Sequence, residues 1–209
     1  VYRELKTLGL DSVLVYQESY HRRTYARHHL RGSKQDFDYR LATPERLGQA
    51  GIDKIGLGVL LGLADDWRCD SLMAAYHLQF LQQHYWRSRY SLSLPRLRPC
   101  VGQNHNPQLP SDRQLAQLIC AWRLVFPELE LSLSTREPAA LRDRLAPLAI
   151  THLSAESSTQ PGGYSDATAT ALEQFSTADQ RPLAAVAASM QLAWLQPVWK
   201  DWQAELGRS

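Results

Sequence analysis

The stretch from Asp11 to His29 reads DSVLVYQESYHRRTYARHH, and it indicates the fold of the chain. It begins with a short apolar run, Val13 to Tyr16, that is typical of a buried β-strand. Polar side chains follow at once, at Gln17, Glu18 and Ser19. Parallel α/β sheets bind their ligands at the carboxyl ends of the strands, so these three residues are candidate ligand contacts. The alternative is an ordinary buried strand that leads into a solvated basic loop.

Strand-like and helix-like segments alternate along the chain after this point. Apolar runs predict strands at 52–61, 90–94, 129–134 and 149–154, and periodic segments predict helices at 36–50, 70–85, 111–126 and 138–145. Each connection between strands is long enough for a right-handed crossover. We therefore predict an α/β fold with a parallel sheet, forming a partial (βα) barrel of about five βα units.

The pattern changes after residue 157. A segment rich in Thr, Gly, Ser and Asp is followed by a predicted helix at 181–192 and a predicted closing strand at 195–199. We divide the chain into barrel, 1–157, and a C-terminal extension, 158–209. Val1 already stands in a helical pattern without a cap, so we expect that the beginning of the protein is missing.

Composition narrows the class of protein. The 209 residues are 44% hydrophobic and 21% charged, which is ordinary for a globular domain. A net charge of +2 argues against a dedicated nucleic-acid surface. No apolar run approaches the roughly 20 residues that a membrane span needs, and no basic-then-apolar run in the given sequence resembles a signal peptide. We expect no membrane association and a cytoplasmic location.

The cysteines and histidines do not suggest a metal site. Cys69, Cys100 and Cys120 lie far apart and lack the spacing of metal-binding motifs, so we interpret them as reduced packing residues. The adjacent His28 and His29 are poorly placed to chelate one ion.

Polar residues recur near the end of every predicted strand. Besides the first group, the sequence places there the polar residues Asp65, Arg96, Arg98, Ser134, Thr135, Arg136 and Ser154, together with Gly62 and Pro95. A barrel would bring them to one rim. For Asp65 and Ser154 alone, a helix cap or a turn is the simpler interpretation. Arg136 could grip a carboxylate with two donors, or could pair with Glu137 or Asp143 at the surface.

Six runs, in order, resemble the later part of the 2-iminoacetate synthase family of radical S-adenosylmethionine (SAM) enzymes. They are VYQESYH at 15–21, GIDKIGLG at 51–58, LPRLRPC at 94–100, LSLSTRE at 131–137, TQPGGY at 159–164 and QPVWKDW at 196–202. The resemblance covers essentially the whole chain. It implies a (βα) barrel with a C-terminal segment shared with biotin synthase.

The resemblance also implies a reaction. The family cleaves SAM with a 4Fe–4S cluster, abstracts hydrogen from tyrosine and breaks its Cα–Cβ bond, yielding 2-iminoacetate and p-cresol. The implied partners are the tyrosine substrate, thiazole synthase, which uses the 2-iminoacetate for thiamine, and a reductant such as flavodoxin.

The family's site residues map onto positions of this chain. Gln17 and Ser19 resemble positions near the SAM ribose, with Glu18 a further contributor, and Arg40 resembles the arginine that pairs with the SAM carboxylate. Positions that resemble the adenine contacts are Gly58, Leu60, Gly62 and Leu97. Asp65 stands where many relatives have Glu. Arg136 resembles the position that holds the substrate's carboxylate, and Ser154 resembles a nearby hydrogen-bonding position.

One part of the family pattern is absent from this sequence. The cysteine triplet that holds the 4Fe–4S cluster has no counterpart here, and it would lie upstream. We therefore expect the chain alone to be inactive. The alternative function is a cluster-free scaffold that binds SAM or thiazole synthase.

Overall fold

The computed structural model describes residues 1–98, 108–159 and 177–199. Within them, five parallel strands form one sheet whose order follows the chain. The strands are β1 (Ser12–Glu18), β2 (Lys54–Val59), β3 (Arg89–Ser93), β4 (Glu130–Leu133) and β5 (His152–Leu153). The predicted parallel α/β architecture is confirmed.

Helices connect the strands. They are α1 (Tyr2–Thr7), α2 (Arg22–His28), α3 (Phe37–Leu41), α4 (Thr43–Gln49), α5 (Trp67–His84), α6 (Asp112–Val125), α7 (Ala139–Ala149) and α8 (Leu183–Leu192), with a short 3₁₀ turn at Ser33–Gln35. Helix α6 matches its sequence signature well. Ser111 and Gln114 form a reciprocal capping box, and Leu115, Ile119 and Trp122 are buried on one face.

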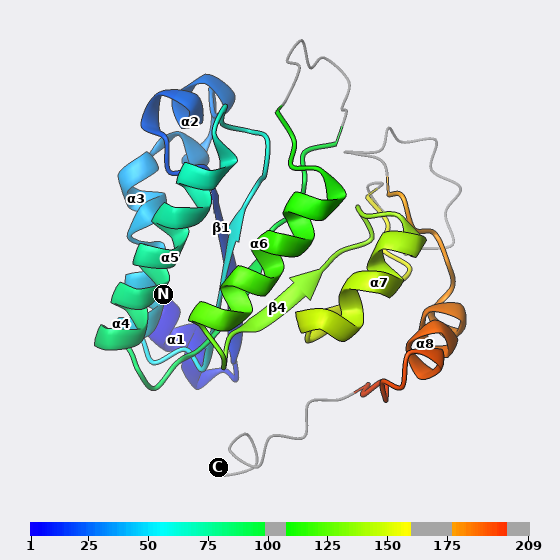
Figure 1. Cartoon of the computed structure of the whole chain (residues 1–209). Helices are drawn as coiled ribbons and strands as arrows, with labels where there is room; N and C mark the ends of the chain where they lie inside the picture. Colours follow the sequence, from blue (N-terminus) through cyan, green and yellow to red (C-terminus); the bar gives the residue numbers. More distant parts are fainter. Residues whose placement is uncertain (99–107, 160–176, 200–209) are drawn as a thin grey trace, which may run out of the picture.

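The core lies between one face of the sheet and these helices. Val15, Leu57, Leu92 and Leu131 are paired across four strands and belong to one buried cluster. Helices α5, α6 and α7 lie along this face of the sheet (Figure 1). Burial of this apolar row fixes which face of each strand is turned away from the helices.

The opposite face of the sheet carries small and polar residues in register. Tyr16 pairs with Gly58, Gly58 with Ser93, and Ser93 with Ser132. The Tyr16 ring covers Gly58 so closely that a Cβ atom at Gly58 would lie 2.3 Å from Cδ1 of the ring. Glycine is therefore required there by the neighbouring aromatic side chain.

The helix predicted at 36–50 is wrong as a single element. The structure has α3 and α4, separated at Ala42. Pro44 has no N–H to continue the hydrogen-bond ladder of α3, and the Thr43 hydroxyl instead donates to the Tyr39 carbonyl at 2.8 Å. The break places Arg40 in the last turn of α3.

The basic segment after β1 is not the solvated loop of the alternative interpretation, because it forms α2. The His21 ring caps the helix by accepting from the Thr24 backbone N–H at 3.2 Å. Tyr25 is fully buried and stacks on His29 with ring centroids 3.9 Å apart. A single buried aromatic side chain anchors a helix whose arginines face solvent.

Two further expectations fail. Residues 195–199 form no strand, and the Val198 and Trp199 side chains are exposed. Cys69 is exposed on α5 and donates to Asp66, so it is not a packing residue. Cys120 is partly buried, whereas Cys100 lies outside the described residues. Among the described helices, none combines the length and apolar character needed to cross a membrane.

Candidate functional site at the carboxyl ends of the strands

Backbone hydrogen bonds connect the carboxyl ends of the first three strands. The Leu60 N–H donates to the Glu18 carbonyl at 2.9 Å, which joins the ends of β1 and β2. The Leu61 N–H donates to the Pro95 carbonyl and the Leu97 N–H to the Leu61 carbonyl, both at 2.8 Å. We call Gln17, Glu18, Leu60, Leu97, Arg136 and Ser154 the strand-end rim.

Gln17 has an unsatisfied acceptor within this rim. Its side chain is buried, and its Oε1 has no hydrogen-bond partner among the described residues. Its Nε2 makes one long bond, 3.5 Å, to the Ser19 carbonyl. An orphaned buried acceptor is uncommon in folded proteins, and a bound hydroxyl or amine donor would satisfy it. Gln17 therefore fits a ligand such as the SAM ribose.

Ser19 is engaged by the protein itself. Its hydroxyl donates to Asp70 Oδ1 at 3.3 Å and accepts from the His21 N–H at 3.1 Å. Asp70 also accepts from the Tyr20 N–H at 2.7 Å. Burial raises the pKa of Asp70, and the bonds from Tyr20 and Ser19 oppose that rise. Ser19 thus shapes the turn after β1 in this structure.

Glu18 has a strained backbone and two cationic partners. Its φ angle is +69°, in the left-handed region, and the β1–β2 register shifts between Tyr16 and Glu18. Its carboxylate contacts Lys34 Nζ at 2.8 Å and His29 Nε2 at 3.0 Å. Burial opposes ionisation, but Lys34 and His29 together lower the pKa of Glu18. The carboxylate is fixed beside the rim in its charged form.

Arg40 makes a different contact from the one its resemblance implies. Its Nε and Nη2 donate to the Tyr16 carbonyl at 3.0 and 2.9 Å. These two hydrogen bonds to one carbonyl oxygen connect α3 to the end of β1. Any contact between Arg40 and a cofactor carboxylate would have to share or replace these bonds.

The residues that resemble adenine contacts lie together along β2 and its neighbour. Gly58 is covered by Tyr16, Gly62 adopts a φ of +95°, and Leu60 is partly exposed between them. Leu97 is buried and joined to Leu61 by the backbone. Asp65 is exposed, and the neighbouring Asp66 caps α5 instead. The ends of β2 and β3 therefore present apolar residues and glycines that have no side chain.

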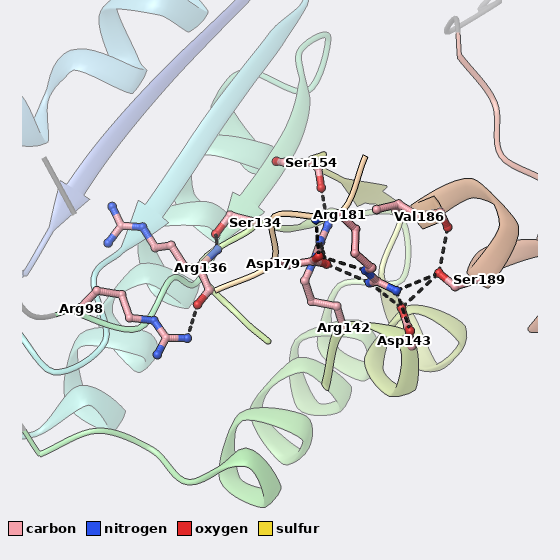
Figure 2. Close-up of polar contacts among 10 residues, drawn as sticks. All are labelled: Arg98, Ser134, Arg136, Arg142, Asp143, Ser154, Asp179, Arg181, Val186 and Ser189. Atoms are coloured by element: carbon pink, nitrogen blue, oxygen red, sulfur yellow. Dashed lines mark hydrogen bonds and ion pairs between the residues drawn. The ribbon is translucent and has the colours of Figure 1, made fainter. Parts of the chain in front are cut away.

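Arg136 lies next to a second guanidinium. Arg98 Nη2 donates to the Arg136 carbonyl and contacts Glu137 at 3.4 Å, and Figure 2 shows the two arginine side chains near each other. Burial, together with the charge of Arg98, lowers the pKa of Arg136, while Tyr16 and Glu18 act in the opposite direction. Arg136 follows the end of β4, so it lies at the same edge of the parallel sheet as the end of β1.

Glu137 and Asp143, the two carboxylates considered as surface partners of Arg136, each bind another arginine. Arg96 holds Glu137 through Nε at 3.0 and 3.1 Å, and Arg181 holds Asp143 with two bonds of 2.9 Å. Arg96 was placed at the strand end by sequence, but its role in fixing the buried Glu137 was not predicted.

Ser154 follows β5 and is exposed. Its N–H donates to the Leu133 carbonyl at 3.2 Å, which ties it to β4, and its carbonyl accepts from Arg142 Nη2. The participation of Arg142 and of its partner Asp179 was also missed by sequence reasoning. No short-range pattern links two residues separated by 37 positions, so only the fold reveals them.

The described part of the chain does not fit an iron–sulfur cluster. No group of three or more His, Cys, Asp or Glu residues is arranged to hold a metal there. Cys69 and Cys120 are free thiols on different helices. The same part does fit a small polar ligand, because it offers an orphaned acceptor, a glycine-lined strand and paired guanidinium groups on one rim.

Known proteins resemble this chain over its whole length. The chain is 63% identical over 208 residues to 2-iminoacetate synthase of Escherichia coli (strain K12). The chain is homologous to 2-iminoacetate synthase. The enzyme of that name from Salmonella typhimurium is 59% identical over 208 residues. All of this chain is matched in both comparisons, but it spans only 55% of the length of either relative.

A domain model and solved structures extend the comparison. Residues 93–193 match the Biotin and Thiamin Synthesis associated domain. The crystal structure of HydG, a maturase of the FeFe-hydrogenase, superposes with a TM-score of 0.88 and 32% identity, covering all of this chain and 45% of that one. HydG from Carboxydothermus hydrogenoformans gives a TM-score of 0.86 at 33% identity, covering 96% of this chain and 46% of that one. The predicted partial (βα) barrel with its associated C-terminal segment is confirmed; the boundary at 157/158 stays a prediction.

Proposed function

We propose that this chain forms the substrate and cofactor rim of a radical SAM carbon–carbon lyase that splits tyrosine into 2-iminoacetate and p-cresol, a cytoplasmic step of thiamine thiazole synthesis. The observation that carries the proposal is the position of Arg136 on the rim of a chain 63% identical to a 2-iminoacetate synthase. The 4Fe–4S cluster, the 2-iminoacetate transfer to thiazole synthase and a flavodoxin-type reductant belong to the same proposal.

In this proposal, one group of rim residues would bind SAM and another would bind tyrosine. Bound SAM would supply a 5′-deoxyadenosyl radical. Gln17 would accept a hydrogen bond from its ribose. Leu60, Gly62 and Leu97 would receive the flat adenine, while Gly58 is covered by the Tyr16 ring and would not contact it directly. Glu18 and Arg40 would position the end of β1 that carries Gln17.

Arg136 would hold the amino-acid carboxylate, because a guanidinium matches a carboxylate with two parallel hydrogen bonds. The neighbouring Arg98 adds positive potential without taking that position, since Arg98 donates to the Arg136 carbonyl and to Glu137. Ser154, at the adjoining strand end, would contribute a hydroxyl. Fixing the carboxylate orients the remainder of the substrate relative to the cofactor.

The test uses the complete protein that contains this chain, reconstituted with iron and sulfide under anaerobic conditions. With SAM, tyrosine and reductant it should form p-cresol and 5′-deoxyadenosine, and tyrosine should be consumed in step with p-cresol. The 209-residue chain treated identically should form neither product. Absence of p-cresol from the complete protein, with SAM cleavage intact, would overturn the assignment of tyrosine as substrate.

A scaffold role is the competing proposal, and the lack of a metal-binding group among the described residues is the observation that favours it. It predicts that the isolated chain binds SAM or thiazole synthase without turnover. Because the enzyme proposal also predicts an inactive isolated chain, p-cresol formation by the complete protein distinguishes the two functions, and calorimetric titration of the chain then tests whether it binds either ligand.

A further inference from the structure

A buried ion pair lies directly behind the substrate end of the rim. Arg142 in α7 and Asp179 in the segment before α8 have side chains only 1% exposed, and they contact each other through Nη1 and Oδ2. Arg181 also contacts Asp179, through Nε at 2.9 Å and Nη2 at 2.8 Å. Figure 2 shows this cluster next to Ser154, to which a dashed line joins it.

The same pair holds both strand ends that carry the substrate candidates. Arg142 Nη2 donates to the carbonyl of Ser154, at the end of β5. The N–H groups of Ala178 and Asp179 donate to the Thr135 carbonyl at 2.9 and 3.0 Å, directly before Arg136. One ion pair therefore joins the backbone beside Ser154 to the backbone beside Arg136.

We propose that the Arg142–Asp179 pair is a positioning device for the tyrosine carboxylate, which sets the separation of Arg136 and Ser154. This inference rests on the proposed function. It makes Asp179, a residue of the segment that follows the sheet, part of the substrate site although it touches no substrate. A guanidinium that donates to a carboxylate and to a carbonyl at once fixes both in one plane, which a flexible ammonium cannot do.

The cluster also provides its own control. Asp143 accepts two bonds from Arg181 at 2.9 Å and one from the Ser189 hydroxyl at 3.3 Å. It has the same chemistry and the same arginine partner, but no hydrogen bond in the described structure joins it to Thr135 or Ser154. Removing its charge should disturb α8 without moving the substrate rim.

The experiment compares Asp179→Asn with Asp143→Asn in the complete, cluster-reconstituted protein. Displacing a substrate-binding group by about 1 Å can cost roughly 100-fold in turnover. We therefore expect Asp179→Asn to lower kcat/KM for tyrosine by about this order, with a raised tyrosine KM, and to lower p-cresol formed per 5′-deoxyadenosine. The SAM KM should not change, and Asp143→Asn should behave like the wild type. Equilibrium titration with tyrosine in the presence of SAM, without reductant, should show the same loss.

A second variant covers the case in which Asp179→Asn does not fold. Arg142→Lys keeps the buried charge but cannot hold both acceptors, so it should show the same selective loss of tyrosine affinity. Equal losses for tyrosine and SAM, an unchanged tyrosine KM, or failure of both variants to fold while Asp143→Asn folds would each overturn the inference. A wild-type protein that makes no p-cresol would instead refute the proposed function.

Discussion

Gly58 and Tyr16 face each other across the β1–β2 pair, with the position of a Gly58 Cβ only 2.3 Å from the Tyr16 ring. The contact involves Cγ and Cδ1, close to the backbone, so the ring cannot simply swing away. Gly58 is therefore coupled to the conformation of β1 immediately before Gln17.

This contact predicts that Gly58→Ala forces Tyr16 out of place and destabilises the complete protein by about 1–3 kcal/mol, as overpacking does. SAM affinity should fall as well, because the end of β1 moves. Urea unfolding and SAM titration measure the two effects. Adding Tyr16→Ala should recover much of the loss caused by Gly58→Ala; additive losses would contradict the coupling.

A second prediction concerns Arg136. In the complete protein, Arg136→Ala should weaken tyrosine use by at least about 2 kcal/mol, roughly 30-fold, because a desolvated charge-assisted grip is lost. SAM cleavage should fall much less. Steady-state kinetics for p-cresol and 5′-deoxyadenosine measure this difference. Arg113→Ala, on the exposed side of α6, is the control, and an unchanged tyrosine KM in Arg136→Ala would exclude the assigned role.

Parts of this site could be predicted from sequence, and parts could not. The alternation of apolar runs with helical segments was sufficient to predict the parallel sheet. The apolar residues of each strand have to pack against the helices, and they form one buried cluster. The polar residues at strand ends followed from that topology. The division of 36–50 into two helices depended on one Pro44, and α2 depended on the burial of one Tyr25.

Long-range ion pairs were beyond sequence reasoning for a different reason. Glu137 was considered as a partner of Arg136, yet Arg96, 41 positions away, holds it. Asp143 was considered in the same way, and Arg181 holds it, 38 positions away. A charged residue pairs with whichever opposite charge the fold brings near, and proximity in sequence says little about that choice.

A third prediction concerns the turn after β1. Asp70→Ala removes the acceptor for the Tyr20 N–H and the Ser19 hydroxyl, leaving buried donors unsatisfied at a cost of about 1–3 kcal/mol. SAM affinity should fall with stability, since this turn follows Gln17. Asp66→Ala, which removes only the exposed cap of the same helix, should cost about 1 kcal/mol and leave SAM affinity unchanged. Similar SAM affinities in the two variants would show that the turn does not serve the cofactor.

The last prediction is the acid sensitivity of the buried pair. Burial opposes ionisation of Asp179, but Arg181 and Arg142 outweigh it and lower the pKa of Asp179 to about 2. An unfolded aspartate has a pKa of about 4, so the unfolded state binds more protons between these values. The stabilisation from Asp179 is therefore complete above about pH 4 and is lost as the pH falls toward 2.

Asp179→Asn cannot take part in this titration. The difference in melting temperature between the wild type and Asp179→Asn should be constant from about pH 7 to pH 5 and should shrink below about pH 4. Calorimetry of both proteins across that range measures it. If the difference did not shrink in acid, the Asp179 carboxylate would not be held in its charged form by Arg142 and Arg181, and the pair could not fix the two strand ends as proposed.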